Sequence, residues 1–238
     1  MKRYYSLDIS TKTKVVGSAP NGPLELNEPL NIRSILEQGK LPKYAEFRLK
    51  GNARLTDYTF CMDAGTWNFY IVSPKLHSIL EQFNLQNHLW SECRIVRKDK
   101  KWDYFMLTLQ QAETDDGYPA LFYPEMIDFK NSVFCESGFA RFSLDGTEPI
   151  LEVSDYYDYL AMQQKYRKSV LKTPRFVKLA FNDEYLERNK IDMCWQFPLY
   201  DCPMISERLK TTLEENDITG IELIDINSCP TREVNLWD

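Results

Sequence analysis

One helical phrase occurs twice in this chain and limits the folds that it can adopt. The stretch SPKLHSILEQFNL begins at Ser73, and the stretch SERLKTTLEENDI begins 133 residues later, at Ser206. The two stretches align without a gap, and the leucines coincide: Leu76 with Leu209, and Leu80 with Leu213. The fold therefore has to accommodate the same local structure twice.

Each copy predicts a short helix with a serine N-cap. A serine before a charged, leucine-bearing run accepts a hydrogen bond from a backbone N–H of the first turn, and Pro74 suits the first helical position. The apolar residues recur at helical spacing, so each helix should present one apolar stripe to a core. Short extended segments, Phe69–Val72 and Met204–Ile205, lead into the caps, and Gly220 precedes a strand-like run. Duplication of a unit and convergence on a common capped-helix pattern both account for the repeat.

The remaining segments mix strand-like and helical patterns without regular β-α-β alternation. This predicts an α+β fold with mixed or antiparallel sheets and a few packed helices. Residues 98–101 (KDKK) predict a hairpin turn, and residues 155–173 predict the longest helix. At 238 residues the chain can form one large domain or two small ones. We place a boundary between residues 1–110 and 111–238, each with one capped-helix unit, and keep one continuous domain as the alternative.

The charge pattern and the apolar runs argue against several classes of partner. The chain has 29 basic and 35 acidic residues, a net charge of −6, and no block of lysines or arginines, so binding along a nucleic-acid backbone is not expected, although these counts leave room for a local basic patch. No apolar run reaches the roughly 18 to 20 residues of a membrane span, and no apolar segment follows the basic N-terminus. Six cysteines without a C-x-x-C pair suit a reducing compartment. We expect a cytoplasmic protein with no nucleic-acid and no membrane partner.

Four phrases follow one another between residues 67 and 226: YFMLTL, IDFKNSVF, RFVKLAF and MISERLKTTLEENDITGIEL. The sharpest marks in them are Asp128, Ser132, Ser206, Leu209, Leu213 and Gly220. This order resembles the immunity protein 11 family of bacterial polymorphic-toxin systems. The resemblance implies a small protein that binds and neutralises a cognate toxin, encoded by a neighbouring gene. It also implies that protection comes from occluding the toxin, without catalysis and without a cofactor.

Asp128 and Ser132 have two interpretations from the sequence. Both are short polar side chains inside the apolar, aromatic phrase IDFKNSVF. Such side chains commonly satisfy neighbouring backbone groups in a turn, which would make the pair structural. The functional interpretation makes them part of a buried polar network or of a ligand pocket.

The sequence contains few features that indicate catalysis. It lacks the G-x-S-x-G elbow and the glycine-rich phosphate loops. Neither His77 nor His88 has a further ligand at metal-binding spacing, so we expect no metal site. The alternative to a toxin inhibitor is an uncharacterised enzyme that uses carboxylates or a Cys-His pair, for example Cys61 or Cys93 with His77.

Two acidic segments that carry tyrosines are the predicted contact surface for the toxin. The first contains Asp155, Tyr156, Tyr157, Asp158 and Tyr159, and the second contains Asp115, Asp116 and Tyr118. Tyrosine provides a large contact area at low entropic cost, and the carboxylates would steer a basic partner. The structural alternatives are a half-buried helix start for the first segment and a solvated loop for the second.

Overall fold

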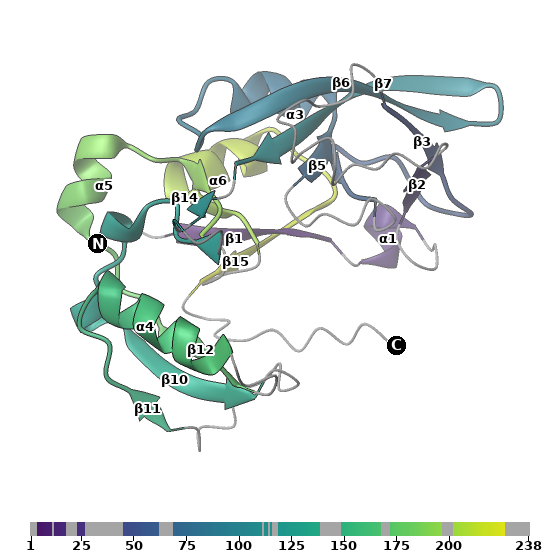
Figure 1. The fold of residues 1–238 in the computed structure, drawn as a ribbon. Coiled ribbons are helices and arrows are strands. Elements are labelled where there is room, and N and C mark those ends of the chain that lie inside the picture. The colour runs from purple at the N-terminus through teal and green to yellow at the C-terminus, as the bar shows by residue number, and fades with distance from the viewer. Residues whose placement is uncertain are drawn as a thin grey trace.

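The fold combines helices with mixed and antiparallel sheets, and the α+β prediction is confirmed. A computed structural model describes residues 4–10, 12–17, 23–26, 45–61, 69–110, 112–113, 115, 119–138, 149–167, 172–196 and 202–226. Within these segments the sheets have six, four, three and two strands, in the orders β2-β3-β6-β7-β5-β4, β13-β14-β1-β15, β11-β10-β12 and β8-β9. Figure 1 shows the six-stranded sheet at the top, the four-stranded sheet in the middle and the three-stranded sheet with α4 at the bottom.

The first capped helix belongs to a unit inside the six-stranded sheet. In chain order this first unit consists of β4 (Tyr58–Thr59), β5 (Phe69–Val72), α3 (Pro74–Leu80), β6 (His88–Arg97) and β7 (Lys100–Leu109). β6 and β7 form a long antiparallel ribbon, and its turn lies at Lys98 and Asp99, as KDKK predicted. Beyond β6 the sheet is extended by β3 (Ala45–Leu49) and β2 (Leu24–Leu26).

The second capped helix belongs to a unit of the same design, built from both ends of the chain. This second unit consists of β13 (Met193–Cys194), β14 (Met204–Ser206), α6 (Glu207–Glu215), β15 (Ile221–Asp225) and β1 (Tyr4–Ile9). β1 takes the place that β7 has in the first unit, because it lies antiparallel between β14 and β15. The connection differs, since β7 follows β6 directly whereas β1 precedes the whole unit.

The strand registers of the two units agree residue by residue. The middle strand of each unit pairs with its two neighbours at matching positions: Phe105 with Val72 and Glu92, and Tyr5 with Ile205 and Asp225. The neighbours are separated by the offset of the repeated phrase, because 72 to 205 and 92 to 225 are both 133 residues. The repeat therefore extends from the helices to the pairing of the sheets.

Both serines cap their helices as predicted, and both also bind an aspartate. Ser73 Oγ accepts from the backbone N–H of Leu76, and Ser206 Oγ does the same for Leu209, each at 3.2 Å. As donors, the two hydroxyls reach equivalent carboxylates: Ser73 Oγ to Asp57 at 2.7 Å and Ser206 Oγ to Asp192 at 2.8 Å. Each carboxylate thus fixes the start of one capped helix.

The loop that follows each capped helix binds the aspartate of the other unit. The backbone N–H of Thr219, after α6, donates to Asp57 Oδ2 at 2.9 Å, and that of Asn84, after α3, donates to Asp192 Oδ2 at 3.0 Å. Gly220 follows Thr219 with φ +87°, and a Cβ atom there would lie 2.2 Å from the carbonyl oxygen of Tyr58. Only glycine lets this loop cross β4 so closely. The two units are therefore interlocked through their aspartates.

Both capped helices also pack into one hydrophobic cluster, the central core. Its buried members include equivalent pairs from the two units: Val72 and Ile205, Leu76 and Leu209, Leu80 and Leu213, and Leu107 and Leu7. The predicted division into residues 1–110 and 111–238 would cut this core, whereas the one-domain alternative keeps it whole.

Two further clusters lie outside the central core. Along a strand successive side chains point to opposite faces, so Ile71 and Met106, next to Val72 and Leu107, lie on the other face of the six-stranded sheet with Phe47 and Ile95. The third cluster joins the four-stranded sheet to η2 (Pro124–Met126), η3 (Phe129–Asn131), β10 (Val133–Gly138), β11 (Ile150–Leu151), α4 (Tyr156–Arg167), β12 (Lys172–Lys178) and α5 (Asp183–Asn189). The other elements are α1 (Thr13–Val16), β8 (Ala112–Glu113) and β9 (Pro119–Ala120).

The helix predicted for residues 155–173 is shorter in the structure. α4 ends at Arg167, and β12 already begins at Lys172. Pro174 lies in this strand opposite Glu136. Proline disfavours the helical conformation of the residue before it and favours an extended one, so the chain has to leave the helix before Thr173.

Candidate functional site

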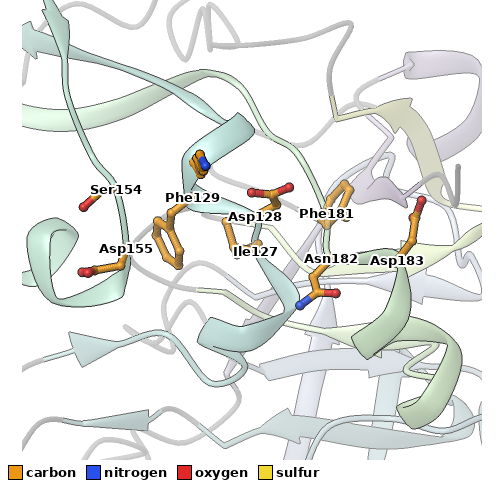
Figure 2. A pocket seen from close by; sticks show the side chains of 9 residues that line it. Ile127, Asp128, Phe129, Ser154, Asp155, Phe181, Asn182 and Asp183 are labelled. Carbon is orange, nitrogen blue, oxygen red and sulfur yellow. The ribbon is translucent and has the colours of Figure 1, made fainter.

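An open groove of about 600 Å³ lies where three helices begin. The helices are η3, α4 and α5, and the groove is lined by Ile127, Asp128, Phe129, Lys130, Ser154, Asp155, Phe181, Asn182 and Asp183. Figure 2 shows Asp155 and Ser154 on one side, Asn182 and Asp183 on the other, and Asp128 and Phe129 between them. Three carboxylates and one ammonium group line the groove, so it carries a negative charge that the helix N-termini offset in part.

Asp128 and Ser132 hold the floor of this groove by binding backbone groups. Asp128 caps η3, because its Oδ1 accepts from the backbone N–H of Asn131 at 3.2 Å. Ser132 Oγ donates to the carbonyl oxygen of Asp128 at 2.7 Å and accepts from the backbone N–H of Ala180 at 2.9 Å. The pair therefore ties the segment before β10 to the segment before α5. These contacts match the structural interpretation, and Asp128 also lines the groove.

Asp155 and Asp158 fix the start of α4. Asp155 Oδ1 accepts from the backbone N–H groups of Tyr157 and Asp158, at 2.8 and 2.9 Å. Asp158 Oδ2 in turn accepts from the hydroxyl and the backbone N–H of Ser154, and these hydrogen bonds lower the pKa of Asp158. This reciprocal pattern resembles a capping box. Among the described residues no donor reaches Asp155 Oδ2, and Asp155 is one of the residues that line the groove.

The three tyrosines of the first predicted segment have different environments. The side chain of Tyr157 is 79% exposed, whereas Tyr156 is half-buried with its ring 6.1 Å from that of Phe129. The prediction of a surface contact is wrong for Tyr159, which is 0% exposed and packs against Phe129 and Phe134. Tyr156 and Tyr159 are three residues apart on one face of the helix, so Tyr157 is directed outward.

The second predicted segment lies mostly outside the described residues. Asp115 is exposed and is not one of the residues that line the groove, and the structure does not describe Asp116 and Tyr118.

The sequence interpretation missed the side of the groove that α5 provides. Asn182 caps α5 by accepting from the backbone N–H of Tyr185 at 3.1 Å, and Asp183 is the first residue of the helix. The signal was present, because an asparagine followed by two acidic residues is a typical helix start. What the sequence cannot provide is the position of this helix beside Asp128 and Asp155.

The Cys-His pair considered from the sequence does not form between the predicted residues. His77 stacks on Phe105 with ring centroids 3.9 Å apart, whereas Cys93 lies opposite Tyr104 and packs with Cys61 in the cluster on the other face of the sheet. Burial raises the pKa of the Cys93 thiol, which disfavours the nucleophilic thiolate. His88 Nδ1 lies 2.8 Å from the carbonyl oxygen of Gln86.

The described residues contain no group of three or more His, Cys, Asp or Glu side chains that could hold a metal ion. Within the same part of the chain, every helix is too short or too polar to cross a membrane. A comparison with protein-family models found no family that matches this chain. A comparison with curated proteins found no match either.

Proposed function

We propose that this protein is an immunity protein that binds a cognate antibacterial toxin in the cytosol and neutralises it by occlusion, without chemistry of its own. The observation that carries the proposal is the acidic groove, together with the exposed ring of Tyr157 on the helix that begins at the groove. The resemblance to the immunity protein 11 family supports the same function. The toxin would be encoded by a neighbouring gene.

The groove and Tyr157 suit a partner with a basic, partly apolar surface. The groove combines the carboxylates of Asp155 and Asp183 with an apolar floor that includes Phe129. A lysine or arginine of the partner can place its charged end on one of these carboxylates and its aliphatic stem on that floor. Tyr157, two residues after Asp155, offers a ring that packs on no buried cluster of the described residues. Aromatic side chains of this kind supply much of the binding energy at protein interfaces.

Two carboxylates of the groove are preorganised by the helices that they cap. Asp128 and Asp155 each use a carboxylate oxygen to cap a helix, so their positions are fixed before a partner arrives. A preorganised surface loses little entropy on binding. Blocking the toxin then requires only that the complex cover the toxin's active surface.

The first test is isothermal calorimetry with the catalytically disabled product of the neighbouring open reading frame. We expect a one-to-one complex with a nanomolar dissociation constant, about −12 kcal/mol. The association rate should fall as salt is added, because surface charges steer the encounter. No heat and no co-elution at tens of micromolar, on the order of −6 kcal/mol or weaker, would remove that neighbour as the cognate toxin.

Two variant pairs test the surface once binding is found. Tyr157→Ala should weaken binding by roughly 2 kcal/mol, about thirtyfold, and Tyr157→Phe should retain most of the affinity because it keeps the ring. Asp183→Asn should slow association, whereas the matched control Asp99→Asn, on the turn of the β6–β7 ribbon, should not. Unchanged affinity in both Tyr157→Ala and Asp183→Asn would assign the contact to another face.

One experiment distinguishes occlusion from the alternative that the protein is an enzyme. Full binding by a variant that loses all protection of a toxin-exposed bacterium would contradict occlusion. Asp155→Asn is suited to this, because asparagine retains the cap of α4 and loses the charge that an acid or base would need.

A further inference from the structure

The fold gathers positive charge that the sequence spreads over three segments. These segments are α1 with its preceding residue, the turn after β3, and the tip of the β6–β7 ribbon. Arg54 Nη1 donates to the carbonyl oxygen of Lys14 at 2.6 Å, and Arg97 Nη1 donates to that of Ala53 at 3.1 Å. A second nitrogen of Arg97 reaches the carbonyl oxygen of Gly51. The two arginines therefore hold the three segments side by side.

We call this region the basic end, and it comprises Lys12, Lys14, Lys50, Arg54, Arg97, Lys98, Lys100 and Lys101. Within the three segments the one carboxylate is Asp99. The neighbouring Arg48 and Arg94 are not included, because Glu25 and Asp103 pair with them. Five lysines of the basic end (12, 14, 98, 100 and 101) are exposed and form no ion pair with a described residue. The basic end therefore concentrates positively charged side chains on a protein whose net charge is −6.

The composition of the basic end favours phosphates over a protein partner. Six of its eight cations are lysines, and lysine is depleted at protein–protein interfaces. Phosphate groups accept lysine as a point charge, and binding to them is strengthened by the release of counterions.

The shape of the ribbon favours a nucleic-acid duplex over a membrane. β3 pairs with β6 no further than Val96, and β5 pairs with β7 only from Phe105 onward, so the tip extends beyond both neighbours (Figure 1). A two-stranded ribbon fits the major groove of a duplex. The tip has the sequence RKDKK at residues 97–101, with no apolar side chain to insert into a bilayer.

We propose that the basic end binds the phosphate backbone of double-stranded nucleic acid, with the ribbon tip entering a groove. The sequence led us to expect no nucleic-acid partner, because it has no block of basic residues. The folded chain nevertheless has a basic surface, because it assembles the basic end from three separate segments. The proposal does not depend on the acidic groove or on toxin binding, because none of the eight residues lines that groove.

The test is fluorescence anisotropy of a labelled duplex DNA of about 20 base pairs, titrated with the full chain between about 50 and 200 mM salt. For about five phosphate contacts, the logarithm of the affinity should fall with the logarithm of the salt concentration with a slope of about −4 to −5. The triple variant Lys98→Asn, Lys100→Gln, Lys101→Gln should lower the affinity at least about tenfold and reduce the steepness of the slope by about 2 to 3. Asparagine is chosen at residue 98 because Lys98 has φ 56°, a conformation that asparagine tolerates.

A matched control separates this surface from a general effect of charge. The triple variant Lys165→Gln, Lys178→Gln, Arg188→Gln removes the same charge from exposed positions outside the basic end, and it should keep the affinity within about twofold. Circular dichroism should show both triple variants folded. Equal weakening by the two triples overturns the proposal, as does no anisotropy change up to about 100 µM protein at about 50 mM salt. Binding to phosphatidylserine vesicles without binding to the duplex also overturns it and assigns the basic end to a membrane surface.

Discussion

At the scale of single residues, Asp57 connects the two units most directly. Its carboxylate accepts hydrogen bonds from Ser73, at the start of α3, and from the backbone and hydroxyl of Thr219, after α6. Burial alone would raise the pKa of Asp57, but these hydrogen bonds and the charge of Lys75 outweigh it and hold the pKa below its ordinary value of 3.8. The ionised form of Asp57 therefore stabilises the folded state.

The stability that Asp57 provides should depend on pH. A depressed folded-state pKa gives stability that is fully present well above pH 3.8, the unfolded value, and is lost as the pH falls through the lower folded value. Asp57→Asn should therefore be less stable than the wild type at pH 7, and the difference should shrink as the pH falls below about 4. Urea unfolding followed by circular dichroism at several pH values measures it. A difference that stays constant down to pH 3 contradicts the role of the charge.

At the scale of elements, the two capped helices share one local structure. α3 and α6 start at a serine, present their leucines to the central core and end in a loop that binds the opposite unit. A common helix pattern explains the serines and the leucines. It does not explain why the strands before and after the helices keep equal registers at the same offset of 133 residues. We therefore favour duplication over convergence.

The two caps should contribute equally to stability. Ser73→Ala and Ser206→Ala each remove one acceptor for a first-turn N–H and one donor to an aspartate, so each should lower the free energy of unfolding by about 1 to 2 kcal/mol. Ser78→Ala, an exposed change within α3, should alter it by less than about 0.5 kcal/mol. Urea denaturation at pH 7 gives the three values. If Ser206→Ala lowered the free energy of unfolding no more than Ser78→Ala does, the second cap would not contribute to stability.

Sequence patterns predicted local structure well and spatial neighbours poorly. The capped helices, the ribbon turn and the α+β class follow from spacing and turn chemistry, which act over a few residues. The partner of β14 could not be predicted, because β1 lies at the opposite end of the chain. The groove could not be predicted for the same reason, since Asp128, Asp155 and Asp183 come from three separate segments. Tyr159 was misassigned because composition, unlike helical periodicity, does not say which side of α4 is buried.

At the scale of the whole molecule, the two units differ in connection and agree in arrangement. β7 follows β6 through a tight turn, whereas the equivalent β1 precedes the other elements of its unit and contacts β15 by strand pairing. This is the relation between a protein and its circular permutant, because the same strands occupy the same places with one connection moved. The central core and the crossed loops then join the permuted unit to the unpermuted one.

This relation predicts that the chain tolerates permutation at two points. The first permutant joins residue 238 to residue 1 through a linker and opens the chain between Thr11 and Lys12, so that β1 follows β15 as β7 follows β6. The second joins the same ends and opens the ribbon between Lys98 and Asp99, so that β7 is separated from β6 as β1 is from β15. Both should give the far-ultraviolet circular dichroism of the natural chain and one cooperative unfolding transition, because the pairing of each strand does not depend on its direct connection. A third permutant, opened between Leu209 and Lys210 inside α6, should fail to fold, because it breaks a helix that contributes to the central core. Loss of folding in both of the first two permutants would mean that each direct connection is needed for folding. The two units would then share an arrangement of strands without tolerating the same change of connection.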